Sequence, residues 1–110
     1  MGGSEGTDTR PEMISGTRLK PRAFSDIREA YEWYEAQSNG LGGLFLRAVD
    51  ESMDRIVEHP ESYPTVIENV RKVMMPRFPY GLFYMVEEDT VVVLACYHAS
   101  RDPKGWRDLI

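Results

Sequence analysis

Along the first half of the chain, apolar residues recur at the spacing of a helix. From Pro21 onward they fall three or four positions apart and form one stripe, made of Ala23, Ile27, Ala30, Tyr31 and Tyr34. This spacing predicts an amphipathic helix. Pro21 suits its first position, where a missing N–H leaves no bond unmade, and Ser25 is an alternative N-cap one turn later. Asn39-Gly40 predicts the end of the helix.

A second helix is predicted after Gly43. Its inner face is apolar apart from one serine and consists of Phe45, Ala48, Val49, Ser52, Met53 and Ile56. Charged residues occupy the opposite face, as expected where a helix meets water. Pro60 predicts its end. Because only a short glycine-rich link, residues 40–43, separates the two helices, they are predicted to form an antiparallel hairpin.

The second half of the chain is rich in β-branched and aromatic residues, which predicts strands. Three strands are expected, at about residues 66–75, 80–86 and 91–99. The last is apolar at every position from Val91 to Tyr97, as in an interior strand covered on both faces. Residues 87–90 predict a tight hairpin turn, and residues 14–19 form a weaker strand candidate ahead of the first helix.

The order of these elements, β-α-α-β-β-β, indicates an α+β fold. We expect the helix hairpin to pack on one face of a small, mostly antiparallel twisted sheet. A chain of 110 residues with 42% hydrophobic residues fits a single domain with one modest core. Residues 1–12 are polar and lack periodicity, so they are predicted to be a disordered tail, and residues 13–110 to be the domain.

The charge balance excludes one class of function. The chain carries a formal net charge of −5, and the acidic excess lies in the first 69 residues, whereas the remainder is nearly balanced. A protein that binds nucleic acid without sequence preference needs a basic surface, so only a local patch in the C-terminal half could meet a polyanion. No apolar run approaches the roughly 20 residues of a membrane span, and no signal peptide is visible, so a cytoplasmic protein without membrane contact is expected.

The residues that usually carry cofactor chemistry are sparse. Cys96 is the single cysteine and lies in an apolar strand, which predicts a core position. His59 and His98 have no neighbours at metal-ligand spacing, and no glycine-rich phosphate loop is present, so neither metal nor cofactor is expected. His98 could act as a general base, but the nearest hydroxyl, Ser100, lacks the surroundings of a nucleophile, which favours a structural histidine.

Basic and aromatic residues cluster toward the C-terminus, and they are the candidates for contact with a partner or target. They are Arg71, Lys72, Arg77, Tyr80, Tyr84, His98, Arg101 and Trp106. Arg71 and Lys72 are adjacent on a strand, so their side chains should point to opposite faces. We expect Trp106 to pack on the sheet end and to hold Arg101 beside one of the two tyrosines of this set.

Several ordered motifs in this chain resemble those of the ParE/RelE superfamily, the toxins of bacterial toxin–antitoxin pairs. They are Pro21-x-Ala23-x-x-Asp26-Ile27, Trp33-Tyr34-Glu35, Gly40-Leu41-Gly42, Pro60-x-x-Tyr63-Pro64, Arg77-Phe78-Pro79-Tyr80 and His98-x-x-Arg101-Asp102-Pro103-x-x-Trp106. Together they extend from about Lys20 to Trp106 and look most like the ParE-like plasmid stabilisation branch. The resemblance implies the same order of strands and helices that the residue patterns predict.

For function, the resemblance implies a toxin that poisons DNA gyrase by binding it and that a cognate antitoxin neutralises. The related RelE-like toxins instead cut mRNA on the ribosome without a metal, using several Lys and Arg side chains and a C-terminal Tyr. Lys72 and Arg101 match positions of that basic set, whereas Met74 and Gly81 stand where the ribonuclease branch carries cations, and Arg107 stands near the expected Tyr. Because metal-free cleavage needs those cations, binding is favoured over catalysis.

Two alternatives stay open from the sequence. One is a ribonuclease in which Lys72 and Arg101 act on RNA, and the other is an attenuated or orphan protein with the toxin fold. The acidic net charge bears on the second, because the antitoxin partners of such toxins are usually acidic. The oligomeric state is also open, with a homodimer among the alternatives.

Overall fold

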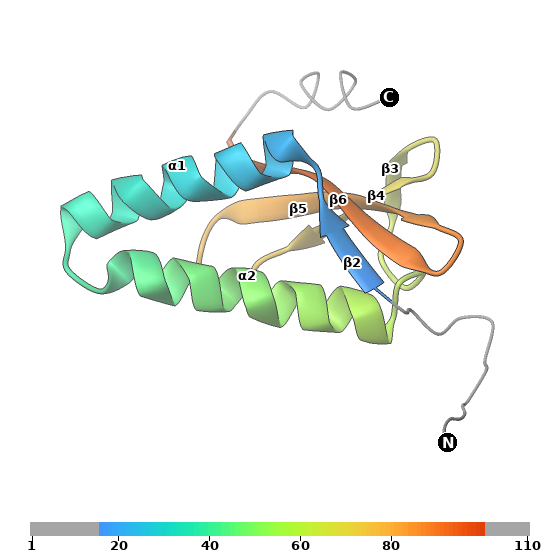
Figure 1. Ribbon diagram of the computed structural model, residues 1–110, viewed down its shortest axis with the longest axis horizontal. Coiled ribbons are helices and arrows are strands. Elements are labelled where there is room, and N and C mark those ends of the chain that lie inside the picture. Colours follow the sequence, from blue (N-terminus) through green and yellow to red (C-terminus); the bar gives the residue numbers. More distant parts are fainter. Residues whose placement is uncertain (1–15, 101–110) are drawn as a thin grey trace.

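The computed structural model describes residues 16–100, and these residues form two helices and a five-stranded sheet (Figure 1). The elements follow the chain in the order β2 (Gly16–Leu19), α1 (Pro21–Gln37), α2 (Leu41–Glu58), β3 (Thr65–Ile67), β4 (Val70–Met74), β5 (Tyr80–Glu87) and β6 (Thr90–His98). In the sheet the strands lie in the order β2-β6-β5-β4-β3, and every neighbouring pair is antiparallel except β2 with β6. The predicted α+β fold is therefore confirmed. The expected tail, residues 1–12, lies outside the described residues.

The predicted helix hairpin is present, and α1 begins at Pro21 rather than one turn later at Ser25. The ring of Tyr34 on α1 stacks on Phe45 of α2, with the ring centroids 5.4 Å apart. The buried residues of the predicted α1 stripe are Ala23, Ile27 and Ala30. Of the two described helices, neither is long and apolar enough to cross a membrane.

The second helix begins earlier than expected, at Leu41, so Gly42 and Gly43 both lie inside its first turn. Gly42 is needed there, because a Cβ atom at this position would lie 2.7 Å from ring carbons of Tyr31 on α1. The two helices thus approach each other too closely at this point to admit a side chain. Residues 41–43, which the sequence analysis assigned to a linker, therefore belong to α2, and Gly42 packs directly against α1.

The start of α2 is capped by a carboxylate from α1. Glu35 accepts hydrogen bonds from the backbone N–H groups of Gly40 (3.0 Å) and Gly42 (2.9 Å). These N–H groups have no carbonyl partner within the helix, and the negative charge lies at the positive end of the helix dipole. Gly40 has a φ of 89°, a left-handed conformation that favours glycine. The turn between the helices is therefore fixed by both its backbone and its cap.

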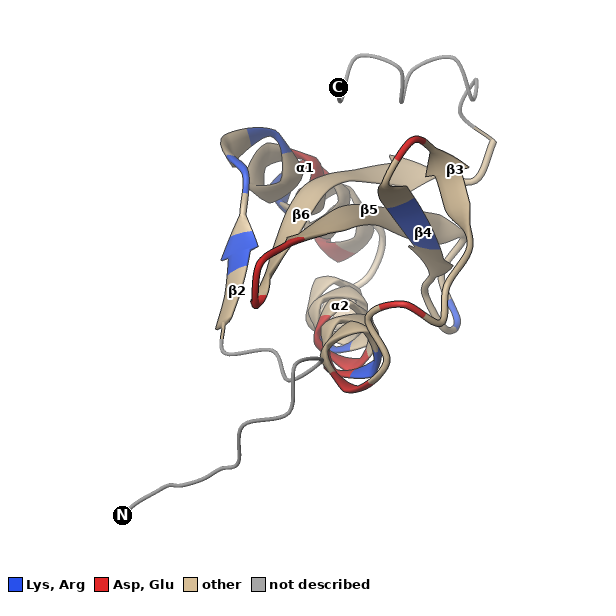
Figure 2. Ribbon diagram, turned by 90° about the vertical axis from the view of Figure 1, so that its right-hand side faces the viewer, with Lys and Arg blue, Asp and Glu red and all other residues tan. Residues whose placement is uncertain are grey.

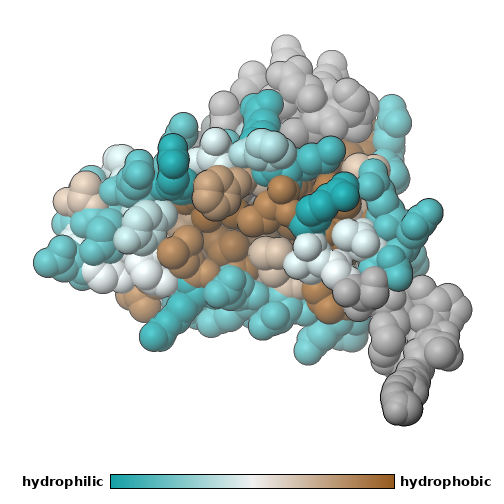
Figure 3. All heavy atoms as spheres, viewed as in Figure 1, coloured by the Kyte–Doolittle hydropathy of each residue, from teal (hydrophilic) through white to brown (hydrophobic). Residues whose placement is uncertain are grey.

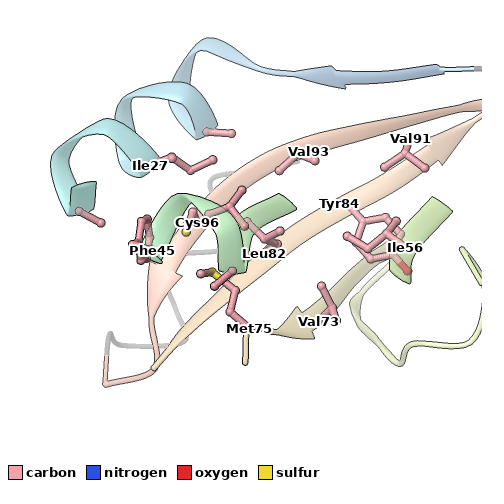
Figure 4. Close-up of a cluster of buried hydrophobic side chains, with 14 residues drawn as sticks. Ile27, Phe45, Ile56, Val73, Met75, Leu82, Tyr84, Val91, Val93 and Cys96 are labelled. Atoms are coloured by element: carbon pink, nitrogen blue, oxygen red, sulfur yellow. The ribbon is translucent and has the colours of Figure 1, made fainter. Parts of the chain in front are cut away.

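The main core lies between the helix pair and one face of the sheet (Figure 4). The helix α2 contributes Phe45 and Ile56, and β5 contributes Leu82 and Tyr84, all fully buried. Strand β6 lies between β2 and β5, and its residues from Val91 to Tyr97 are all buried, which confirms the predicted interior strand. A second cluster consists of Val70, Phe83, Val92, Leu94, Ala95 and Tyr97. Because side chains alternate along a strand, this smaller cluster covers the other face of the sheet.

One strand prediction is wrong. The single strand expected at residues 66–75 is two strands, β3 and β4, which pair antiparallel as a short hairpin. Between them Glu68 has a φ of 48°, the left-handed conformation that tight turns use. The apolar residues on either side hide this turn in the sequence. Strands β5 and β6 agree with the expected strands, and the weak candidate near residues 14–19 is β2.

Charged residues avoid the middle of the sheet (Figure 2). Strand β6 carries none, and β5 carries only Glu87, at its end. Strand β4 carries Arg71 and Lys72, and β2 carries Arg18, which pairs with Glu87 at 3.6 Å. The charges that could serve function therefore lie on β2 and β4, on the helices and at strand ends.

Candidate functional site

The predicted contact residues do not form one surface, and Arg71 is tied to the backbone of a neighbouring loop. Its Nη1 donates hydrogen bonds to the carbonyl oxygens of Tyr63 at 2.6 Å and Glu61 at 3.2 Å. Both acceptors belong to the connection between α2 and β3. Arg71 therefore holds this connection against β4.

Tyr84 lies in the core. Its side chain is fully buried, and its hydroxyl donates to the carbonyl oxygen of Pro60 at 2.7 Å. Burial raises the pKa of Tyr84 to about 12, an effect that the nearby Arg71 guanidinium partly opposes. The prediction of Tyr84 as a contact residue needs correction, because in this fold its ring and hydroxyl are used inside the domain.

Lys72 points to the sheet face opposite Arg71, as the strand alternation predicts. Its Nζ lies 5.8 Å from the centroid of the Phe83 ring. A Cβ atom at Gly81 would lie 3.1 Å from the Lys72 Cε and 3.3 Å from the Met74 Sδ, so these three residues adjoin one another. Two of the positions where the ribonuclease branch carries cations therefore border Lys72 but hold uncharged residues.

Arg77 lies in the loop between β4 and β5 and contacts the helix pair. Its Nη2 is 3.2 Å from both carboxylate oxygens of Glu51 on α2, and both side chains are about half exposed. Arg77 has a φ of 67°, which is uncommon for a residue with a side chain. The loop conformation thus directs the guanidinium toward α2.

Tyr80 and His98 do come together. They are paired across β5 and β6, and their rings lie 5.1 Å apart, edge to face. The Nδ1 atom of His98 accepts a hydrogen bond from the Ser100 backbone N–H at 3.0 Å. The Ser100 hydroxyl lies 2.8 Å from the same nitrogen. This arrangement is a local turn contact at the end of β6.

Tyr80 and His98 border a hollow beside α1, which we call the α1 pocket. Its volume is about 470 Å³, and it is lined by Asp26, Glu29, Ala30, Trp33, Tyr80, Cys96 and His98. The sequence prediction of site residues omits the four from α1. Their spacing of three, four and seven positions places them on one helix side, and this periodicity is the signal that could have found them.

The floor of the α1 pocket joins α1 to β6. The Asp26 carboxylate accepts a hydrogen bond from the Cys96 backbone N–H at 3.0 Å. Cys96 is buried, as predicted, and burial raises the pKa of its thiol to about 12, with a further contribution from the Asp26 carboxylate. The thiol is therefore protonated at neutral pH and is not a nucleophile. Burial likewise raises the pKa of Tyr80, helped by Tyr34 and Cys96.

The helix pair also exposes large apolar side chains. On the described helices these are Phe24, Trp33, Leu44 and Leu46. Figure 3 shows hydrophobic residues gathered in the middle of one side of the molecule, with hydrophilic residues around them. Such an arrangement is typical of a protein-binding surface.

Two of the predicted site residues, Arg101 and Trp106, lie outside the described residues, so their placement stays a prediction. Among residues 16–100, no group of three or more His, Cys, Asp or Glu side chains lies close enough to hold a metal ion.

Comparison with known protein families identifies the family of this chain. The family described as "ParE toxin of type II toxin-antitoxin system, parDE" matches residues 17–103. The chain belongs to this ParE family. A ParE relative from Mycobacterium tuberculosis, Toxin ParE2, is 22% identical over 94 residues, which cover 84% of this chain and 90% of the relative. The superfamily predicted from the sequence motifs is thus confirmed.

Solved structures bear out the ParE/RelE fold. The structure of the chromosomal ParDE system from P. aeruginosa superimposes with a TM-score of 0.59 at 16% identity, covering 81% of this chain and 99% of that one. The isolated RelE toxin of E. coli gives a TM-score of 0.57 at 17% identity, covering 84% and 93%. At these identities the likeness is one of fold, which toxins of the ParE and RelE types share.

Proposed function

We propose that this ParE-family toxin acts by binding DNA gyrase and that a cognate antitoxin neutralises it. The observation that supports binding over catalysis is the dispersal of the cations of the predicted set that lie within residues 16–100. Arg71 donates to loop carbonyls, Arg77 pairs with Glu51, and Lys72 lies on the other face of the sheet from Arg71. These three cations therefore do not converge on one point.

Metal-free RNA cleavage needs such convergence. The reaction requires a base for the 2′-hydroxyl and several cations around the phosphate, where negative charge develops. Beside Lys72 the structure has Met74 and Gly81, which supply no charge. The Nδ1 atom of His98 already accepts a hydrogen bond from the Ser100 backbone N–H. These features favour a toxin that works through protein contacts.

The antitoxin half of the proposal is supported by the surface of the helix pair. Four large apolar side chains are exposed on the described α1 and α2, and Phe24 and Trp33 each keep 58% of their surface open to solvent. Aromatic residues of this kind commonly anchor protein interfaces. The structure with a similar fold from P. aeruginosa is described as a chromosomal ParDE toxin–antitoxin system, which supports an antitoxin partner for this chain.

The target can be tested with purified protein in two parallel assays. In the first, gyrase supercoils relaxed plasmid in the presence of increasing amounts of the toxin. In the second, the toxin is added to a translation extract and the mRNA is analysed for cleavage. We expect inhibited supercoiling and intact mRNA. Cleavage that disappears in Lys72→Ala would instead establish the ribonuclease alternative.

The antitoxin half is tested separately in growing cells. Induced expression of the toxin should arrest growth, and co-expression of the short reading frame beside its gene should restore it. Unimpaired growth at high toxin levels would contradict the toxin function and would favour an orphan protein with the toxin fold.

A further inference from the structure

The strand β2 has a neighbour on one side only. Among residues 16–100 it pairs with β6, and it forms a border of the five-stranded sheet (Figure 2). The Lys20 N–H donates to the Val93 carbonyl of β6 at 2.9 Å. Because backbone groups alternate in direction along a strand, the N–H and C=O groups of Thr17 and Leu19 point away from β6. These groups form a free edge of the described sheet, and a free edge can pair with a further strand.

A hollow lies between β2 and α2, and we call it the β2–α2 groove. Its volume is about 450 Å³, and it is lined by Thr17, Asp50, Met53, Asp54 and Val57. Met53 and Val57 are half-buried and make part of the lining apolar, whereas Asp50 and Asp54 are exposed. Side chains alternate between the two faces of a sheet. Every second side chain of a strand added at the free edge of β2 therefore lies on the same face as Thr17, toward this groove.

The two carboxylates of the β2–α2 groove are available to a partner. Within residues 16–100, neither Asp50 nor Asp54 forms an ion pair or a side-chain hydrogen bond. No Lys or Arg is among the described residues that line the groove. Arg18 is next to Thr17 on β2, so its side chain points to the opposite face, and it pairs with Glu87 at 3.6 Å. The groove is thus acidic as well as partly apolar, which makes it complementary to a long basic side chain.

We propose that an extended segment of the cognate antitoxin pairs with the free edge of β2 as a further strand and directs a lysine or arginine side chain into the β2–α2 groove. This inference rests on the toxin–antitoxin function proposed above. Backbone hydrogen bonds to the edge supply binding, and side chains at alternate positions supply selectivity. The methylene stem of the basic residue packs on Met53 and Val57. Its charged end lies near the Asp50 and Asp54 carboxylates, and this complementarity favours a basic segment over an acidic one.

The edge can be tested without the antitoxin, using as the probe an acetylated and amidated pentapeptide that alternates threonine and lysine. It is titrated into the full-length, ¹⁵N-labelled protein, and the amides of Thr17 and Leu19 are followed by NMR. We expect a saturable shift of both signals and slower exchange of both amide hydrogens with solvent, because the peptide accepts hydrogen bonds from them. A peptide methylated at every backbone nitrogen should bind about tenfold more weakly. A peptide with glutamine in place of lysine should bind about fivefold more weakly.

Matched variants separate the backbone edge from the charge. Thr17→Pro removes an N–H that faces away from β6, a change that edge strands tolerate, and should weaken binding of the peptide about tenfold. Thr17→Val keeps this N–H and the shape of the side chain, so it should bind as the natural protein does. Asp54→Asn should weaken binding about threefold, and it tests the groove independently should Thr17→Pro fail to fold. Glu32→Gln, an exposed residue of α1 that does not line the β2–α2 groove, should leave binding unchanged.

Several results would overturn the inference. Equal binding of the methylated and unmethylated peptides would exclude strand pairing, and so would the absence of a saturable shift. If the shift appears only after residues 1–15 are removed, those residues are the occupant of the edge. If the amides of Thr17 and Leu19 exchange slowly without peptide and lose this protection on dilution, the occupant is a second copy of this chain. Because the peptide replaces the antitoxin, these results stand whether or not the growth and gyrase experiments uphold the toxin function.

Discussion

Tyr84 and Cys96 are titratable residues that are buried in this fold. Their polar groups are accommodated in different ways. The Tyr84 hydroxyl replaces water with the Pro60 carbonyl at 2.7 Å, across 24 positions of sequence. Cys96 is buried as an uncharged thiol next to the Asp26 carboxylate. Both residues therefore link stability to their protonation, and each can be probed by one substitution.

Removing the Tyr84 hydroxyl should destabilise the domain. In Tyr84→Phe the Pro60 carbonyl is left without its partner in the core, which should lower the free energy of unfolding by about 1–3 kcal/mol. Urea denaturation at neutral pH measures this. Tyr31→Phe is the control, since that side chain is only partly buried, and its effect should stay within about 0.5 kcal/mol. Equal effects of the two substitutions would contradict the role of the buried hydrogen bond.

Stability should also fall in alkaline solution. The ordinary pKa values of Cys96 and Tyr84 are 9.0 and 10.0, and burial raises both to about 12. Their contribution is complete below the ordinary values and is lost as pH rises toward 12, because the unfolded chain releases these protons first. Each group adds a slope of about 1.4 kcal/mol per pH unit in its window. Urea denaturation between these pH values should show the decline.

Cys96→Ala separates the two contributions to this alkaline decline. In this variant the free energy of unfolding should stay level until the tyrosine window begins near pH 10.0, whereas the natural protein declines from pH 9.0. Identical pH profiles for the two proteins would mean that the thiol does not resist ionisation in the folded state.

The two residues also differ in how well the sequence predicts them. Cys96 lies in an unbroken apolar run, so a core position follows directly. Tyr84 lies near basic residues in the sequence, which suggests a surface. Its alternation with Leu82 puts it on the core face, but only the packed structure reveals Pro60 as the acceptor.

At the scale of elements, the link between α1 and α2 depends on the difference between two adjacent glycines. A Cβ at Gly42 would meet the Tyr31 ring at 2.7 Å, whereas a Cβ at Gly43 meets nothing within 4 Å. Both glycines lie in the first turn of α2, so their intrinsic cost to the helix is similar. The pair therefore isolates the effect of close helix packing.

Alanine substitution at the two glycines should change the free energy of unfolding in opposite directions. Gly42→Ala forces the helices apart and should lower the free energy of unfolding by about 1–3 kcal/mol. Gly43→Ala should raise it by about 0.5–1 kcal/mol, because alanine is the better helix former. Thermal and urea denaturation of the two variants measure both effects. A loss of stability in Gly43→Ala as large as that in Gly42→Ala would refute the packing argument.

The helices were the most predictable elements, because apolar residues recur at helical spacing over several turns. The start of α1 is also marked by Pro21. The start of α2 was not, since glycines read as a linker until the contact with Tyr31 is known. The β3–β4 hairpin was missed for a related reason. Its turn uses Glu68 in a left-handed conformation, and no glycine or Asn-Gly pair marks it.

At the scale of the whole molecule, β6 is the strand on which the sheet depends. It has hydrogen-bonded neighbours on both sides and carries buried residues along nearly its full length. Strands β2 and β3, by contrast, are short and form the two borders of the described sheet. Local stability should follow this order, because opening the centre requires more burial to be lost.

Amide hydrogen exchange should reveal this order directly. We expect the slowest exchange in β5 and β6, at rates set by global unfolding, and faster exchange in β2 and β3. The comparison is made within one sample by NMR, with the exposed outer face of α2 as an internal reference. Uniform protection across all strands would contradict the expected gradient.

The α1 pocket is also a property of the whole molecule. Asp26 and Cys96 are 70 positions apart and meet only because α1 crosses the sheet beside β6. The helical spacing of the α1 residues can be recognised in the sequence. The sequence does not show which residues of β5 and β6 they face. The fold class could therefore be predicted from the sequence patterns. The α1 pocket could not, because it forms only where α1 packs on the sheet.

The parallel pairing of β2 with β6 has a consequence for how the protein is made. Thr17 aligns with Val91, so the first described strand has no neighbour until the last one exists. The ribosome synthesises the chain from its N-terminus, so β2 has no strand partner until residues 90–93 have been made. A product of a message broken upstream of Thr90 contains the helices but lacks the strand that joins β2 to β5. Interrupted translation therefore leaves β2 without its strand partner, and the five-stranded sheet can form only when synthesis has run through β6.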